Sequence, residues 1–181
     1  MLRSSRPLSD TAPERFATWL SIDVGPELRK RGFTKNGSTF HRRTPESWEI
    51  LNFQKSQWGS RLETSFTINL GVALDRLTVV RGGDPSRKPP ENWCHWRSRI
   101  GRLLEDQEDH WWTLDLETDL PELTAEIVPL LVDRALPLLE ACSTEAGFLA
   151  TAKTNGGPGN LWIPKAQVLE TLETGDDRPS E

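Results

Sequence analysis

The chain has 181 residues, of which 35% are hydrophobic and 27% are charged, and its formal net charge is −5. A chain of this length can bury roughly 70% of its unfolded surface, so a single domain needs no cross-link to hold its core. The acidic balance argues against a nucleic-acid partner, because phosphate recognition needs a basic surface, and no apolar run is long enough to predict a membrane span.

Composition divides the chain into three parts. Residues 1–12 are polar and predict a flexible N-terminus that lacks the apolar run of a signal peptide. Residues 13–152 carry most of the apolar periodicity and predict a single α+β domain. Residues 153–181 predict a glycine-rich loop, a short helix over 166–173 and an acidic tail.

The first predicted element is a helix from Pro13 to Arg31, which Asp10 or Thr11 can cap. Its core stripe repeats every four residues and consists of Phe16, Leu20, Val24 and Leu28. Gly25-Pro26 lies inside this pattern, and we expect it to kink or split the helix because proline cannot donate a backbone hydrogen bond.

A run of strands follows the first helix. The Asn36-Gly37 turn precedes a short strand over 38–43, and two longer strand-like segments span 48–55 and 66–72. A further extended piece is predicted over 74–81. Short turns between consecutive strands are typical of an antiparallel meander.

The second half of the chain begins with a Gly- and Pro-rich surface loop over 82–92. Residues 93–104 fit a helix or an extended segment equally well, and residues 110–116 alternate like a strand. Residues 120–142 give the clearest helix, in which Pro129 and Pro137 should each bend the axis. The expected fold is therefore α+β, an antiparallel β-sheet of three to five strands with an N-terminal helix and a long C-terminal helix packed on one face.

The two central strands predict a polar face, because side chains alternate across a strand. If both strands turn their large apolar residues to one core, the opposite face carries Asn52, Gln54, Thr67 and Asn69. The loop between the strands adds Lys55, Gln57 and Trp58, which completes a candidate binding site. Two alternatives remain open: the amides can tie strands to loops, and Trp58 can fold back onto the sheet edge.

No catalytic residue is assigned, because nucleophile elbows, P-loops and dinucleotide fingerprints are all missing from the sequence. Cys94 and Cys142 fit no metal or redox motif, and Cys94 with His95 and His110 makes a poor zinc site. We therefore expect no cofactor, no metal and no disulfide, and two free thiols suit a cytoplasmic location.

Three segments together resemble a known bacterial family, catalogued as domain of unknown function 4304. They are residues 28–40, 52–58 and 66–72, and the resemblance covers roughly residues 14–145. It implies helices around a small sheet, and it assigns no activity, cofactor or functional residue.

The sequence thus favours a non-enzymatic binding or protein-interaction module, of which immunity and antitoxin proteins are examples, with another protein as partner and neither nucleic acid nor membrane. The alternative is an enzyme with its site on the polar face, around Asn52, Gln54, Asn69 and the 55–58 loop. This alternative lacks a general base among those residues. A third hypothesis, an RNA-binding sheet with exposed aromatic residues, needs a positive face that the composition does not supply.

Overall fold

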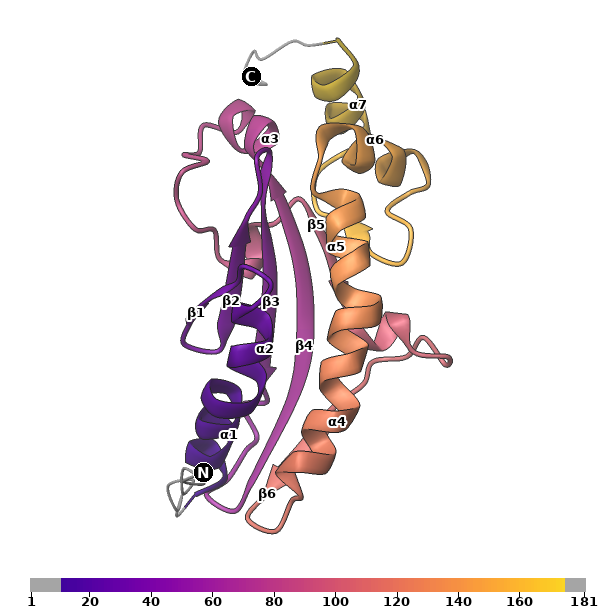
Figure 1. Ribbon diagram of the computed structural model, residues 1–181. Helices are drawn as coiled ribbons and strands as arrows, with labels where there is room; N and C mark the ends of the chain where they lie inside the picture. Colours follow the sequence, from indigo (N-terminus) through magenta and orange to yellow (C-terminus); the bar gives the residue numbers. More distant parts are fainter. Residues whose placement is uncertain (1–10, 175–181) are drawn as a thin grey trace.

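The computed structural model describes residues 11–174 and shows a mixed α+β fold built on one antiparallel sheet (Figure 1). The predicted fold class is confirmed, and so is the placement of the N-terminal and long C-terminal helices on one face of the sheet. The predicted strand number of three to five is too low, because the described sheet has seven strands. The extra strands are short and come from segments whose sequence signals are weak.

The sheet is organised around one long central strand, β4 (Figure 1). The strands are β1 (Thr34–Asn36), β2 (Thr39–Arg43), β3 (Ser47–Lys55), β4 (Glu63–Leu74), β5 (Trp96–Arg99), β6 (Trp112–Asp115) and β7 (Asn160–Leu161). Their order is β1-β2-β3-β4-β5-β7, and every pairing is antiparallel. One edge of β4 pairs with β3 over nine residues, while the other edge is shared by β6 and β5, one after the other.

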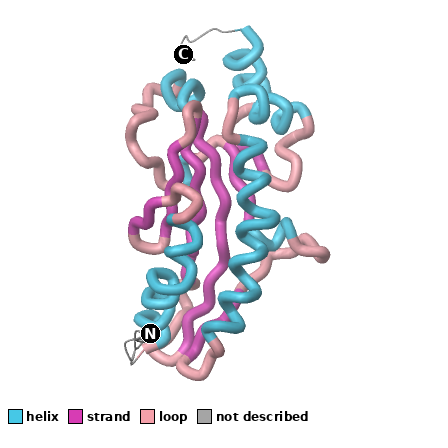
Figure 2. The backbone as a smooth tube through the Cα atoms, in the orientation of Figure 1, coloured by secondary structure: helices cyan, strands magenta, loops and turns pink. Residues whose placement is uncertain are grey.

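Two long helical runs lie along the sheet, and the shorter helices lie at one end of it (Figure 2). The α-helices are α1 (Ala12–Trp19), α2 (Gly25–Arg29), α3 (Asp75–Val80), α4 (Leu120–Leu130), α5 (Leu136–Cys142), α6 (Glu145–Lys153) and α7 (Lys165–Thr174). The 3₁₀ turns are η2 (Glu91–Trp93) and η3 (Ile100–Leu103). The caps follow the sequence, since Thr11 and Asp119 accept hydrogen bonds from the backbone N–H groups of Glu14 and Glu122.

Two prolines lie directly after wider, π-helical turns, η1 (Leu20–Val24) and η4 (Leu131–Ala135). Pro26 and Pro137 each follow such a turn by two residues. A proline has no N–H, and its ring clashes with the carbonyl four residues back, so a local widening of the helix lets the chain continue. Pro26 and Pro137 are therefore accommodated inside continuous helical runs over 12–29 and 120–142, whereas Pro129 lies within α4 itself and has no such widened turn before it.

The prediction of an extended segment over 74–81 is wrong, because this segment forms α3. Leu77 and Val80 are buried three residues apart, while Val79 is half exposed at 50%. That spacing is helical, and Asp75 adds an acidic residue to the first turn, where the helix dipole favours it.

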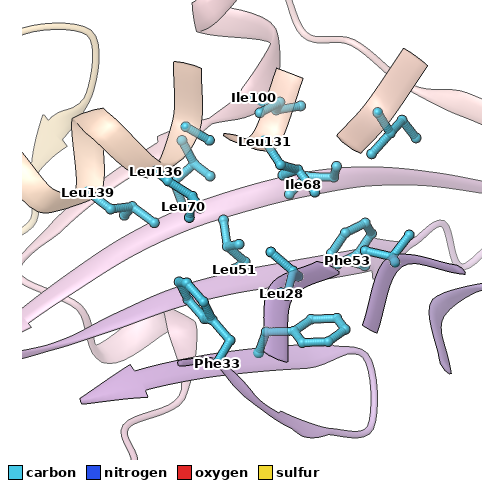
Figure 3. Packing of buried hydrophobic residues seen from close by; sticks show 14 of the residues in the cluster. Leu28, Phe33, Leu51, Phe53, Ile68, Leu70, Ile100, Leu131, Leu136 and Leu139 are labelled. Atoms are coloured by element: carbon cyan, nitrogen blue, oxygen red, sulfur yellow. The ribbon is translucent and has the colours of Figure 1, made fainter. Parts of the chain in front are cut away.

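The main core fills the space between the sheet and the two long helical runs (Figure 3). Ile68 and Leu70 point from β4 toward Leu131 and Leu136 of the long helical run. Phe53 of β3 belongs to the aromatic packing on the α1 side, with its ring centroid 6.1 Å from that of Trp19. On the α1 side the aromatic rings pack directly, with the Phe16 and Phe66 centroids 5.0 Å apart. Burial on this face fixes the register of the central strands, because a slip of one residue would expose the whole apolar set.

The opposite face of the sheet, called here the outer face, carries a small buried apolar cluster of Trp48, Ile50, Ala73 and Cys94. The covering loop, residues 81–95, lies over it, and Trp48 Nε1 donates to the carbonyl of Pro85 at 2.9 Å. A Cβ on Gly71 would lie 2.6 Å from Cys94 Sγ, so the close packing of this thiol needs a glycine beneath it.

Residues 153–174 also join this body. The strand β7 pairs with β5, and Ile163 and Val168 are buried in the main core. Among the described helices, none combines the length and the apolar character needed to cross a membrane.

Candidate functional site

A row of polar side chains crosses the outer face from one strand to the next. The pairing registers place the members directly opposite one another, in the order Asn36, Thr39, Asn52, Asn69 and Arg99. Gln54 lies opposite Thr67 one step further along the strands. The predicted grouping of the four polar residues on one face, opposite the apolar residues of the same strands, is confirmed.

The amides of this row are held by hydrogen bonds to each other. Asn69 Nδ2 donates to Gln54 Oε1 at 2.7 Å and to Asn52 Oδ1 at 3.3 Å, and Asn52 Nδ2 donates to Thr39 Oγ1 at 2.8 Å. Asn69 is 5% exposed, whereas Gln54 is exposed. The buried Asn69 side chain therefore fixes the orientation of the more accessible Asn52 and Gln54 amides through these hydrogen bonds.

Arg99, the last member of the row, is joined by Arg97 two residues earlier on the same strand. Arg97 makes a two-pronged ion pair with Glu91, with N–O distances of 2.6 and 2.9 Å, and its guanidinium lies 4.3 Å from the ring centroid of Trp162. Arg99 pairs with Asp109. Burial acts to raise the pKa of Asp109, but hydrogen bonds from Arg99 and Trp111 outweigh it, and the pKa falls below its usual value.

The outer face is hollowed on both sides of Gln54 and Glu91, and we call the combined depression the groove. Each half has a volume of about 490 Å³. The first half is lined by Asn36, Thr39, His41, Asn52, Lys88 and Pro89. The second half is lined by Asn69, Arg97, Arg99, Arg102, Asn160 and Trp162. Amides, a hydroxyl and paired charges therefore dominate a surface that can exchange many hydrogen bonds with a ligand.

The structure brings only part of the predicted site together. Asn52, Gln54 and Asn69 line the groove, whereas Thr67 is fully buried and its hydroxyl has no hydrogen-bond partner among residues 11–174. Lys55 lies on the helix-covered face, with Nζ 6.0 Å from the ring centroid of Phe16.

The remaining two predicted residues lie outside the groove. Gln57 and Trp58 occupy the turn that follows β3, and neither lines the hollowed surface. The Trp58 side chain is 86% exposed, so it does not fold back onto the sheet edge. It forms a separate exposed feature at one end of the sheet.

Several groove residues were missed by reasoning from the sequence, chiefly Arg97, Arg99, Glu91 and Trp162. The run Trp96-Arg97-Ser98-Arg99 alternates between buried and more exposed residues. This alternation is the signal in the sequence that indicates a strand with both arginines on one face. The pairing of β5 with β4 joins segments about 30 residues apart, and local pattern cannot reveal such a contact.

His41 lines the groove, and a hydrogen bond holds its ring in place. His41 Nε2 donates to the carbonyl of Pro89 at 3.0 Å, and burial lowers the His41 pKa in spite of this bond. Among residues 11–174, no three side chains of His, Cys, Asp or Glu gather in a way that would hold a metal ion.

Comparison with known proteins gives one match. The model of a family described as "Domain of unknown function (DUF4304)" matches residues 24–141. No curated protein and no solved structure matches the chain. The matched segment contains β1 to β6 and the long helical run, and therefore most of the groove.

Proposed function

The chain belongs to the family of domain of unknown function DUF4304, and on that premise we propose that it is a non-catalytic protein-interaction module whose groove binds an extended segment of a partner polypeptide. The observation that carries this proposal is the cross-strand row from Asn36 to Arg99. Neighbouring strands lie about 4.8 Å apart, so a row over five strands spans roughly 19 Å, the length of about six extended residues.

The chemistry of the row suits a peptide backbone. An extended chain offers alternating N–H and C=O groups, and an amide side chain can both donate to and accept from such groups. The Asn52 and Gln54 amides are already oriented by Asn69, so binding loses less side-chain entropy than it would with mobile amides.

The carboxylates of the groove favour binding over catalysis. Among the described residues that line the groove, the acidic ones are Glu91, Glu108 and Asp109. Both oxygens of Glu91 accept hydrogen bonds from Arg97, and the pKa of Asp109 is lowered by Arg99 and Trp111. A general base works best with a pKa near the working pH, and an ion-paired carboxylate of lowered pKa is a weak one.

The proposal is tested with a phage-displayed library of random dodecapeptides, selected on the wild-type protein. Synthetic versions of the enriched peptides are then titrated by calorimetry against the wild type and against the double variant Asn52→Ala/Gln54→Ala. We expect the double variant to bind about tenfold more weakly or worse, because two oriented amides are lost from the groove.

Two variants of the loop between β3 and β4 serve as matched controls. Gln57→Ala removes an amide, and Trp58→Ala removes an exposed indole, and both residues lie outside the groove. Both should retain wild-type affinity. If the library yields no binder, or if the groove double variant binds as tightly as the wild type, the proposed function is wrong. If Trp58→Ala alone loses binding, the interaction belongs to the loop.

A further inference from the structure

A second cavity lies beyond the groove, between the covering loop and the residues around Trp162. Its volume is about 370 Å³, which is at the small end of the range for ligand sites. Ala73 and Cys94 belong to the apolar cluster of the outer face and contribute an apolar lining. We call this hollow the Trp cavity, because Trp93 and Trp162 both line it.

The Trp cavity has one cation and no carboxylate in its described lining. Arg81, at the end of α3, lines it together with uncharged residues. Among residues 11–174, no acidic side chain forms an ion pair with Arg81, whereas Arg42, Arg43, Arg97 and Arg99 are all paired. In a chain with a net charge of −5, an arginine left facing a cavity in this way favours an anionic ligand.

A histidine adds a hydrogen-bond donor without adding charge. His95 lines the same cavity, and its Nδ1 accepts a hydrogen bond from the backbone N–H of Leu74 at 3.1 Å. The neutral ring therefore carries its proton on Nε2. Burial lowers the pKa of His95 to about 4, so the ring stays neutral at pH 7 and Arg81 supplies the single positive charge.

The two tryptophans differ from most others in the chain. Trp19, Trp48, Trp96 and Trp112 are buried, and the Nε1 atom of each donates to a partner elsewhere in the fold. Trp93 and Trp162 are instead 71% and 57% exposed. The backbone N–H of Trp162 donates to the carbonyl of His95 at 2.8 Å, which holds the main chain at this residue, and the Arg97 guanidinium lies over one face of the Trp162 ring. Exposed indoles offer faces on which a flat ring can stack.

We propose that the Trp cavity binds a small aromatic carboxylate, with the carboxylate paired to Arg81 and the ring packed between the apolar lining and the indoles of Trp93 and Trp162. One guanidinium with one neutral donor matches a single negative charge better than a doubly charged phosphate. The volume suits a single ring system. The site is a separate hollow from the peptide groove, although Pro89, Asn92 and Trp162 line both.

The test uses 4-fluorobenzoate as the probe and 4-fluorobenzamide as its neutral twin, which has the same ring and nearly the same shape. Dissociation constants are measured from the broadening of the fluorine NMR signal on addition of the full-length protein. We expect the benzoate to bind about tenfold more tightly than the benzamide, because only the benzoate pairs with Arg81.

Three variants locate the binding. Arg81→Gln should remove the preference for benzoate while leaving benzamide binding unchanged, and Trp93→Ala should weaken both ligands. Arg87→Gln is the matched control, because it removes the same charge from the same exposed loop at a residue that does not line the cavity. Thermal melting verifies that each variant is folded.

Equal binding of the two probes to the wild type would overturn the proposal, as would the lack of binding by either at millimolar concentration. Retention of the benzoate preference in Arg81→Gln would overturn it as well. None of these results bears on the peptide library experiment, because Asn52 and Gln54, the amides that the peptide test changes, do not line the Trp cavity.

Discussion

The imidazole of His95 is enclosed between the end of β4 and the covering loop, and its charge state follows from that position. The side chain is 3% exposed, and burial lowers its pKa from 6.5 to about 4, with a smaller contribution from Arg81. Protonation would place a charge in this poorly hydrated site, and it would put a proton on the Nδ1 atom that accepts from Leu74.

His95 should therefore make the protein less stable in mild acid. Between pH 6.5 and 4 the unfolded chain binds a proton on this histidine and the folded chain does not, so the free energy of unfolding falls as the pH falls. The loss should reach roughly 2–3 kcal/mol at pH 4. Urea unfolding at a series of pH values, on the wild type and on His95→Gln, measures it.

The glutamine variant isolates this effect, because its amide oxygen can accept the Leu74 N–H and does not titrate. All other titrating groups, including His41 with its own lowered pKa, are common to both proteins. The difference between the two curves should appear below pH 6.5. Parallel curves would show that the histidine is hydrated in the folded protein.

At the scale of elements, Arg42 of β2 joins the sheet to the helices on its covered face. Its guanidinium bonds to the carboxylate of Glu49, to Glu140 of α5 at 2.9 Å and to the Arg31 carbonyl at 3.2 Å, and it lies 4.7 Å from the centroid of the Phe33 ring. Glu49 is fully buried, and its second oxygen has no hydrogen-bond partner among the described residues. Burial raises the pKa of Glu49 even though the ion pair with Arg42 opposes the shift.

Replacing Arg42 should therefore be costly. Arg42→Met keeps an apolar stem but leaves the Glu49 carboxylate buried without its partner, and we expect a loss of about 3–5 kcal/mol in the free energy of unfolding at pH 7. Adding Glu49→Gln to this variant should recover part of the loss, because an amide is cheaper to bury than a charge. Chemical denaturation measures both.

The neighbouring Arg43 provides the control. It pairs with Asp75 at 2.5 Å, but both side chains are partly exposed, at 38% and 25%. Arg43→Met should cost only about 0–1 kcal/mol. Similar losses for the two arginines would mean that the Glu49 site is hydrated and that Arg42 contributes as an ordinary surface pair.

Whether an element could be predicted from the sequence depended on whether its signal lies within a short stretch of chain or comes from contacts between distant segments. The helix over 120–142, the Asn36-Gly37 turn and the polar alternation of β3 and β4 follow from signals within about 20 residues, and all three are confirmed. The segment 74–81 was mistaken for a strand because its β-branched residues outweighed a short helical period. The groove was only half predicted, since Arg97, Arg99 and Trp162 reach it through pairings of β5 and β7 that local pattern does not encode.

At the scale of the whole molecule, the two faces of the sheet are covered unequally. One face carries the helical layer and the main core (Figures 1 and 2), whereas the outer face is covered in part by the loop over residues 81–95. This loop is held by a few contacts, among them the bonds from Trp48 to Pro85 and from His41 to Pro89. Segments with few apolar contacts open at a lower free energy than the global unfolding of the protein.

The two cysteines report on the two faces separately. Cys94 lies in the outer cluster at 1% exposure, and Cys142 lies in the main core at 0%. Burial raises the pKa of both thiols, so neither forms the reactive thiolate until the structure around it opens. The reaction rate of each thiol therefore measures how often its own cover opens.

We expect Cys94 to react with Ellman's reagent more than about tenfold faster than Cys142, because the covering loop can lift while the helical layer stays in place. The single-cysteine variants Cys142→Ala and Cys94→Ala give the two rates at neutral pH without denaturant. A low concentration of urea should speed up the Cys142 reaction more steeply, since exposing Cys142 uncovers much more surface. Equal rates with equal urea dependence would mean that the loop and the core open together. In that case the outer face would be as firmly closed as the helical one, and the groove and the Trp cavity would have rigid walls.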